Sequence, residues 1–200
     1  MQSTIHAEAL AGGFAEPATQ SARAFRSVME AMARPGVVQD IAGAMPPAPL
    51  SPAAGAVILT LCDTDTPLYL AGEADCEAVR AWVAFHTGAP FSDPSHCMFA
   101  IGKWGALTPR TDYPVGTSEY PDRSATLIVE LDRFAETGTV LRGPGIKETA
   151  ALSLPETAAF EANHALFPLG LDFIFTSDDR LAALPRSTEI CTPRGVTGVL

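Results

Sequence analysis

The side chains in this sequence best suited to binding chemistry are two arginines at proline-containing turns. Arg34 directly precedes Pro35, and Arg186 directly follows Pro185. A guanidinium group binds a phosphate or a carboxylate through two parallel hydrogen bonds, and an adjacent proline stiffens the backbone that carries it. The two arginines therefore predict either an oxyanion-binding site or structural ion pairs with some of the 23 Asp and Glu residues, and the sequence favours neither.

A second polar turn carries Asp63 and Asp65, one residue apart, followed by Thr66-Pro67. Two carboxylates with this spacing can share a hard cation such as Mg²⁺. Aspartate is also common in turns, where its side chain hydrogen-bonds the local backbone, and the proline fixes the same turn. We favour the structural turn over the cation site.

His86 ends a segment with helical apolar spacing, directly before Thr87-Gly88. A histidine at this position can interact with the last carbonyl groups of the helix. His96 and Cys97 are the nearest other soft ligands, but the spacing of the three residues matches no zinc site. The sequence therefore predicts helix capping or packing at a dimer interface for His86, and no metal site.

The sequence contains no self-sufficient catalytic motif. The turn at 143–149 lacks the glycine directly before lysine that a Walker loop needs, and no serine lies in a Gly-x-Ser-x-Gly elbow. Lys103 and Lys147, the only lysines, are placed like exposed turn residues rather than like an aldimine-forming lysine. Cys62 and Cys97 adjoin apolar runs, where a thiolate is disfavoured. We predict no cofactor and no catalytic residue in the isolated chain.

The composition indicates one soluble domain. A chain of 200 residues that is 47% hydrophobic can bury roughly 70% of its unfolded surface. The formal charge of −10 would repel a nucleic-acid backbone or an anionic membrane. The four cysteines form no Cys-x-x-Cys pair, and no apolar run approaches the ~20 residues that span a bilayer. These features predict a cytoplasmic protein with reduced thiols.

Residues 1–18 lack apolar periodicity, which predicts a flexible N-terminal arm, and the periodic segments that follow predict a single domain over 19–200. Thr19 or Ser21 can cap a first helix that carries Phe25, Val28, Met29 and Met32 on one face and ends at Pro35-Gly36. Further helices are predicted over 53–61, after the N-cap pair Ser51-Pro52, over 75–88 and over 155–166. Strands are predicted at 68–70, 98–101, 125–131, 139–141 and 171–175. Helices interleaved with apolar strands indicate a layered α/β domain.

The order of several short segments along the chain resembles one protein family. These segments are Phe25-Arg26, 31–36 (Ala-Met-Ala-Arg-Pro-Gly), Leu61-Cys62-Asp63, Asp65-Thr66-Pro67, 85–90 (Phe-His-Thr-Gly-Ala-Pro), Gly116-Thr117, 125–128 (Ala-Thr-Leu-Ile), 167–172 (Phe-Pro-Leu-Gly-Leu-Asp) and Pro185-Arg186-Ser187-Thr188. Together they resemble the PhnH family, a component of the bacterial carbon-phosphorus lyase system, over nearly the whole chain. Each segment alone is weak evidence, but their common order and spacing make the resemblance specific.

The resemblance implies an α/β fold: a single layered domain with a mixed β-sheet flanked by helices. That fold is similar to the large domain of pyridoxal-phosphate-dependent transferases, without the cofactor, and the resemblance also implies a homodimer. The binding or interface residues that it suggests are Arg34, Asp63, His86, Thr117 and Arg186.

The resemblance further implies a non-autonomous subunit of the carbon-phosphorus lyase core complex, assembled with subunits G, I and J. Such a subunit supports the formation of alpha-D-ribose 1-phosphonate 5-triphosphate from ATP and a phosphonate. The alternative hypothesis is an independent binding module or enzyme for phosphate, phosphonate or nucleotide, in which Arg34, His86 and Arg186 line one cleft.

Overall fold

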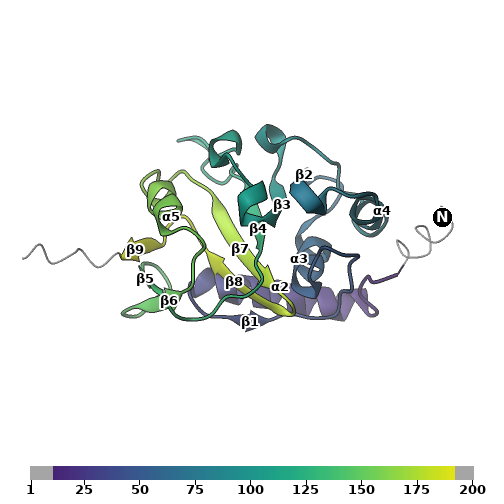
Figure 1. Ribbon diagram of the computed structural model, residues 1–200, viewed down its shortest axis with the longest axis horizontal. Coiled ribbons are helices and arrows are strands. Elements are labelled where there is room, and N and C mark those ends of the chain that lie inside the picture. The colour runs from purple at the N-terminus through teal and green to yellow at the C-terminus, as the bar shows by residue number, and fades with distance from the viewer. Residues whose placement is uncertain (1–10, 192–200) are drawn as a thin grey trace, which may run out of the picture.

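The fold is built on a six-stranded mixed β-sheet with helices on both faces (Figure 1). The structure is a computed structural model, and it describes residues 11–191. The strand order is β1-β8-β7-β4-β3-β2. The strands are β1 (Gln39–Asp40), β2 (Leu68–Leu70), β3 (Phe99–Lys103), β4 (Thr126–Glu130), β7 (Asp172–Ser177) and β8 (Arg180–Leu184). Neighbours among β2, β3, β4 and β7 are parallel, whereas β8 is antiparallel to both β7 and β1. The predicted α/β class with a mixed sheet is confirmed.

Alternate residues of the central strands supply two separate cores, as the two-residue period of a strand requires. On one face, Ile101, Ile128 and Ile174 pack with the helices α2 (Pro17–Ala33), α3 (Pro52–Leu61) and α4 (Glu77–His86). On the other face, Leu127 and Phe173 pack with α5 (Thr157–His164) and a second, smaller sheet. The sheet is therefore buried on both sides.

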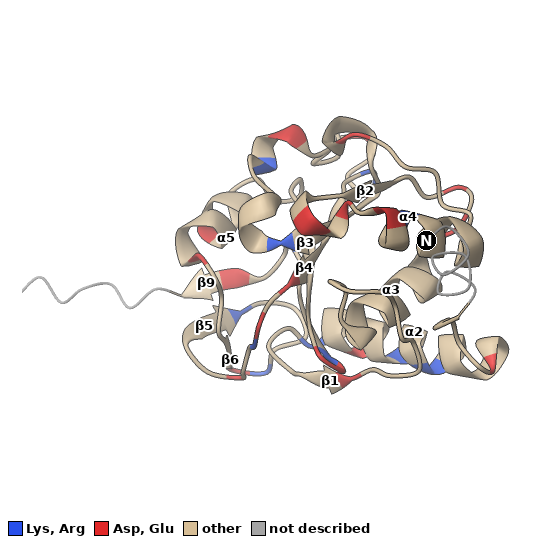
Figure 2. Cartoon of the chain, turned by 45° about the vertical axis from the view of Figure 1, so that its right-hand side comes forward, with Lys and Arg blue, Asp and Glu red and all other residues tan. Residues whose placement is uncertain are grey.

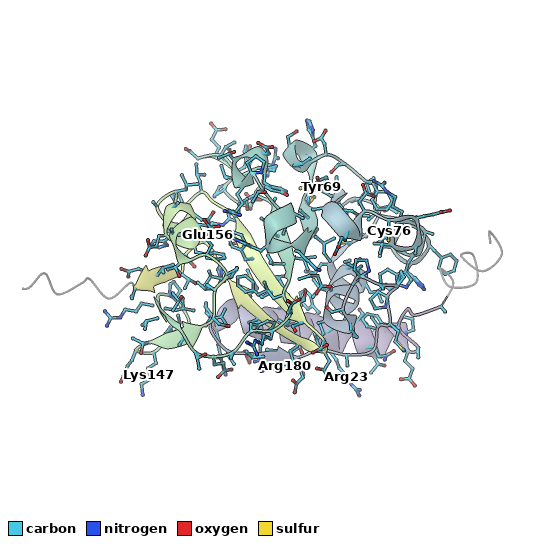
Figure 3. The ribbon with its side chains drawn as sticks, in the orientation of Figure 1. Arg23, Tyr69, Cys76, Lys147, Glu156 and Arg180 are labelled. Carbon is cyan, nitrogen blue, oxygen red and sulfur yellow. The ribbon has the colours of Figure 1, made fainter. Side chains whose placement is uncertain are left out.

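The smaller sheet has the order β6-β5-β9 and is antiparallel throughout. Its strands are β5 (Thr139–Arg142), β6 (Ala150–Leu152) and β9 (Glu189–Cys191). The glycine-containing turn after β5 reverses the chain, which confirms the structural interpretation of 143–149. Lys147 extends from this turn into solvent (Figure 3). Short 3₁₀ turns occupy Gly72–Ala74, Pro94–His96, Trp104–Ala106 and Arg110–Asp112.

The start and the buried face of α2 differ from the prediction. The helix begins at Pro17, two residues before Thr19, and its N-cap Glu16 makes no side-chain capping bond. Proline at the first helical turn is preorganised for a helix and needs no donor there, which explains the earlier start. Val28 is buried as predicted, but Phe25 is 49% and Met29 55% exposed. The side of α2 that faces the core consists of Ala24, Val28 and Ala31. The buried side is therefore rotated about the helix axis relative to the predicted one.

Residues 11–16, from the predicted arm, already contact the domain. The Trp82 indole donates a hydrogen bond to the Ala11 carbonyl (3.1 Å), and the Met45 amide donates to the Gly12 carbonyl (2.8 Å). Phe14 packs against the core. Residues 1–10 of the predicted arm lie outside the described residues. Within 11–191, no helix combines the length and the apolar character needed to cross a bilayer.

Candidate functional site

Arg186 is held in a nearly buried ion pair at the start of β7. Its Nε donates to Asp172 Oδ1 (3.1 Å), and its Nη2 donates to Asp172 Oδ2 and to Ser124 Oγ. Its Nη1 donates to the Pro121 carbonyl (2.6 Å). The Arg186 and Asp172 side chains are only 13% and 16% exposed. These bonds use all but one of the five guanidinium N–H donors, so Arg186 is the structural ion pair rather than an open fork for a ligand.

Thr117 belongs to the loop that this ion pair holds. The Tyr120 amide donates to both the Thr117 carbonyl (3.1 Å) and the Thr117 hydroxyl (3.0 Å), and the Thr117 amide donates to the Tyr120 carbonyl (3.1 Å). The next residue, Pro121, accepts the bond from Arg186. Thr117 is exposed, but its polar groups are bonded within its own turn. Its place in the structure is that of a turn residue next to the sheet.

Asp63 and Arg34 also make local contacts. The Asp65 amide donates to Asp63 Oδ1 (2.9 Å), and the Asp63 amide and the Thr66 hydroxyl are hydrogen-bonded (2.6 Å). This is the structural turn favoured from the sequence, and no group of three His, Cys, Asp or Glu side chains within 11–191 is arranged to hold a metal ion. Arg34 Nε lies 3.4 Å from Glu30 Oε2 on the surface, and the Arg34 side chain is 63% exposed.

His86 fixes the N-terminal segment against α4. Its Nε2 lies 3.2 Å from the Ala11 carbonyl oxygen, and its ring centroid lies 5.1 Å from that of Trp82 and 4.9 Å from that of Phe85. A Cβ atom added at Gly13 would lie 2.5 Å from the imidazole, so the segment passes directly over the ring. His86 is therefore a packing residue in the described chain.

The single cleft of Arg34, His86 and Arg186 expected under the alternative hypothesis is not formed. Arg34 follows α2 and pairs with Glu30, His86 ends α4, and Arg186 follows β8. None of the three lines a hollow at the strand ends or beside α5. Each of the three side chains instead has its own set of neighbours: Arg34 pairs with Glu30, His86 lies against Ala11, and Arg186 pairs with Asp172.

A first hollow, absent from the sequence predictions, lies at the carboxyl ends of the parallel strands, where open α/β sheets commonly bind ligands. Two adjoining spaces of ≈ 270 and ≈ 450 Å³ share Pro49, Leu50, Lys103 and Glu130. Glu130 Oε1 accepts a hydrogen bond from the Ser51 amide (2.6 Å), and Oε2 accepts from the Thr176 hydroxyl (3.2 Å). Burial raises the pKa of Glu130 in spite of these donors. We call this space the strand-end cleft.

Lys103 at the rim of the strand-end cleft is paired with an acid. Its Nζ lies 3.0 Å from Glu73 Oε2, and the hydrogen bond to Glu73 raises the pKa of the ammonium group. A lysine that forms imines requires the opposite shift, toward the neutral amine. The strand-end cleft is therefore lined by several carboxylates and by one lysine whose charge is paired with Glu73.

A second hollow, of ≈ 820 Å³, lies beside α5, and we call it the α5 hollow. Its apolar walls come from Pro109, Val115, Ala158, Ala159, Ala162, Leu166, Leu171 and Phe173. Its polar rim includes Arg110, whose Nη2 donates to Glu156 Oε2 (2.9 Å) and whose guanidinium lies 4.2 Å from the Trp104 ring centroid. Glu156 is labelled beside α5 in Figure 3. Apolar hollows of this size are typical of binding sites.

Sequence reasoning missed the α5 hollow because its walls come from segments about 50 residues apart in the chain, 108–115 and 156–173. The only local signal is a run of small side chains on α5, where alanine at 158, 159 and 162 leaves space that larger residues would fill. Leu166 and Phe167, which follow α5, are 48% and 56% exposed. Exposed apolar patches of this kind mark interaction surfaces.

Two of the four free cysteines are chemically protected. Burial raises the pKa of Cys62 to about 12 and the pKa of Cys97 to about 11, with smaller contributions from the charges of Asp63 and Asp93. We expect both thiols of the folded protein to react with iodoacetamide at pH 8 more than about tenfold more slowly than in urea-unfolded protein. Peptide mass spectrometry would measure this, with the half-buried Cys191 as internal reference. Equal folded and unfolded rates at Cys62 would contradict it.

Comparison with known proteins identifies the family. The family described as "Bacterial phosphonate metabolism protein (PhnH)" matches residues 12–191. A protein of Rhizobium meliloti (strain 1021), named alpha-D-ribose 1-methylphosphonate 5-triphosphate synthase subunit PhnH, is 41% identical over 197 residues, which cover 94% of this chain and 98% of that protein. A protein of Stutzerimonas stutzeri, provisionally named C-P lyase subunit protein HtxG, is 31% identical over 183 residues, 84% of each chain. This chain belongs to the PhnH family of bacterial phosphonate metabolism proteins.

Proposed function

We propose that this chain is a non-autonomous subunit of the carbon-phosphorus lyase core complex, in which it supports the formation of alpha-D-ribose 1-phosphonate 5-triphosphate from ATP and a phosphonate. The observation that carries the proposal is the 41% identity to a named synthase subunit over 98% of that protein's length. The match extends over nearly the full length of both proteins, as expected for two chains with the same role. The second relative, also named for a C-P lyase subunit, supports the same role.

The proposed partners are a second copy of this chain and subunits G, I and J, and the proposed location is the cytoplasm. In support, the described chain leaves large apolar side chains in solvent at several places, including Phe25, Met29, Leu166 and Phe167. Since such side chains are costly to hydrate when they are clustered, they favour a protein that works in an assembly. The α5 hollow is the proposed docking surface for an apolar side chain from one of these three other subunits, because Leu166 lines the hollow itself.

The proposed fold is similar to the large domain of pyridoxal-phosphate-dependent transferases, without the cofactor. The mixed sheet with helices on both faces supports this similarity. The two lysines do not have the environment of an aldimine-forming residue: Lys147 lies on an exposed turn, and Glu73 holds Lys103 as an ammonium ion. The proposed similarity is therefore one of shape and not of chemistry.

The test is co-expression of this chain, carrying an affinity tag, with subunits G, I and J, followed by purification and mass determination. We expect one stable complex, and we expect adenine release from ATP with methylphosphonate only when the complex is present. Deletion of the gene should abolish growth on methylphosphonate as phosphorus source. Growth of the deletion strain, or recovery of the tagged chain without any partner, would overturn the proposal.

The same pull-down tests the α5 hollow. Leu166→Glu places a charge at the apolar wall and should reduce recovery of the partner subunits more than about tenfold, because a buried unpaired charge opposes docking. Met45→Glu is the matched control, since Met45 is 78% exposed and lies outside the hollow. Equal recovery with both variants would place the docking surface elsewhere without affecting the subunit assignment.

A further inference from the structure

The outer face of α2 carries both apolar and charged residues, and no described element covers it. Its six residues, Ala22, Phe25, Arg26, Met29, Glu30 and Ala33, line one shallow hollow of ≈ 530 Å³. They lie opposite the buried stripe of Ala24, Val28 and Ala31, which packs toward α3 and β8. Figure 1 shows α2 along the lower edge of the molecule, with one side toward the core. We call these six residues the α2 outer face.

At 3.6 residues per turn, the six residues fall into three parallel lanes along the helix. Phe25 and Met29 form an apolar lane, Ala22 and Ala33 form a central lane of small side chains, and Arg26 and Glu30 form a charged lane. The alanine lane allows a second helix to approach closely, while the apolar lane supplies area to bury.

Each lane has nearly the same midpoint. The midpoint of the Phe25–Met29 pair is residue 27, that of the Arg26–Glu30 pair is residue 28, and that of the Ala22–Ala33 pair lies between them. When two copies of a helix pack antiparallel about a two-fold axis, a residue on one copy faces the residue at the mirrored position on the other copy. The three residue pairs of the α2 outer face are thus centred on nearly one point. An antiparallel copy would therefore set apolar against apolar, small against small, and Arg against Glu.

From this symmetry we infer that the α2 outer face is the surface through which two copies of this chain associate, with the two α2 helices antiparallel. Phe25 of each copy then packs on Met29 of the other, and the two central alanines pair. Arg26 of each copy faces Glu30 of the other, so the interface contains two crossing ion pairs. The inference deepens the homodimer of the proposed function and rests on it.

The charge of the molecule favours this occupant over an acidic partner face. The chain carries a net charge of −10, so most faces of two copies repel each other. Figure 2 shows basic residues along α2. One of the basic residues of α2, Arg26, lies on the α2 outer face. The α2 outer face carries one arginine and one glutamate, so two copies of this acidic chain can associate through it without net repulsion between the two faces.

The contact area sets the expected strength. A helix of 17 residues is ~25 Å long, and two such helices bury an area at the low end of specific interfaces. We expect a dimer that dissociates on dilution through the micromolar range. Sedimentation velocity of the isolated full-length chain over a series of concentrations would measure its Kd.

The decisive experiment uses two charge reversals that are complementary to each other. Arg26→Glu gives a face with two acids at 26 and 30, and Glu30→Arg gives a face with two bases, so each variant repels itself across the two-fold axis. We expect about a tenfold or greater rise in Kd for either variant alone. An equimolar mixture should form a heterodimer, because every crossing pair is then of opposite charge, and native mass spectrometry would detect it.

The control is Arg23→Glu, which makes the same charge change on the same helix outside the α2 outer face and should alter Kd by no more than about twofold. Circular dichroism verifies that the variants fold. The inference is overturned if Arg26→Glu and Glu30→Arg each dimerise with the Kd of the wild type, or if the wild type is monomeric at millimolar concentration. It is also overturned if the mixture of the two variants forms no more dimer than either variant alone. None of these outcomes bears on the pull-down of subunits G, I and J, which tests the proposed function separately.

Discussion

Replacing Arg186 by alanine is expected to lower the free energy of unfolding by about 3–5 kcal/mol, because it leaves a mostly buried carboxylate without its partner. Asp172 loses both of its side-chain bonds to the guanidinium, and the Pro121 carbonyl and the Ser124 hydroxyl lose their donor. The bond from the Arg186 amide to Asp172 Oδ1 (2.9 Å) remains but cannot compensate for the charge. Urea unfolding followed by tryptophan fluorescence would measure the change.

Two further variants make this prediction specific. Arg34→Ala removes an exposed arginine whose ion pair with Glu30 is screened by water, so its effect should stay within about 0.5 kcal/mol. Arg186→Met combined with Asp172→Leu removes both charges and should be less destabilised than Arg186→Ala alone. A change of under about 1 kcal/mol for Arg186→Ala would show that solvent reaches the pair far more than its 13% and 16% exposure indicates.

The second large effect is expected for Gly145→Ala, with a loss of about 2–4 kcal/mol in the free energy of unfolding. Gly145 has φ +80° and sits in the turn between β5 and β6. A Cβ atom there would lie 1.8 Å from the Ala33 carbonyl oxygen at the end of α2. The substitution therefore combines a left-handed backbone with a collision against another backbone, and neither can relax by a side-chain rotation. The turn and the helix end must move apart.

Gly105→Ala is the matched control. A Cβ atom at Gly105 meets nothing within 4 Å, and its backbone is not in the left-handed region. Since alanine restricts the unfolded chain more than glycine does, this variant should be neutral or stabilising by up to about 1 kcal/mol. Thermal unfolding of the two variants side by side would measure the contrast. A Gly145→Ala protein as stable as Gly105→Ala would mean that the turn does not press against α2.

The parts of the fold that depend on local chemistry were predictable. Ser51-Pro52 predicted the start of α3, and the structure confirms it, since the Ser51 hydroxyl accepts a bond from the Ala54 amide (3.1 Å). The spacing of Val79, Trp82 and Val83 predicted α4, and all three are buried. The central strands were found from their apolar runs, because a parallel strand buried on both faces lacks polar interruption.

Features that depend on distant partners were not predictable. The sequence left Arg186 open between a ligand and an ion pair, because Asp172 and Ser124 lie 14 and 62 positions away. The helical period of α2 identifies a range of apolar positions but not which of them the sheet covers, and Phe25 was therefore assigned to the wrong side. β8 was not predicted because Leu181 to Leu184 is short and contains two alanines, and only its pairing with β7 makes it a strand.

The carboxylate of Glu130 has a consequence for the start of α3. In doubly wound folds, a helix start at this edge of the sheet binds phosphate through free backbone amides. Here the Ser51 amide donates to Glu130, the Ala53 amide to the Asp178 carbonyl, and the Ala54 amide to the Ser51 hydroxyl. Glu130 thus competes with a free phosphate for the Ser51 amide. Because Glu130 belongs to the same chain, its effective concentration at this amide is high, and a phosphate would have to displace it. The first amides of α3 are thus already bonded within the chain, so this helix start is not an open phosphate site.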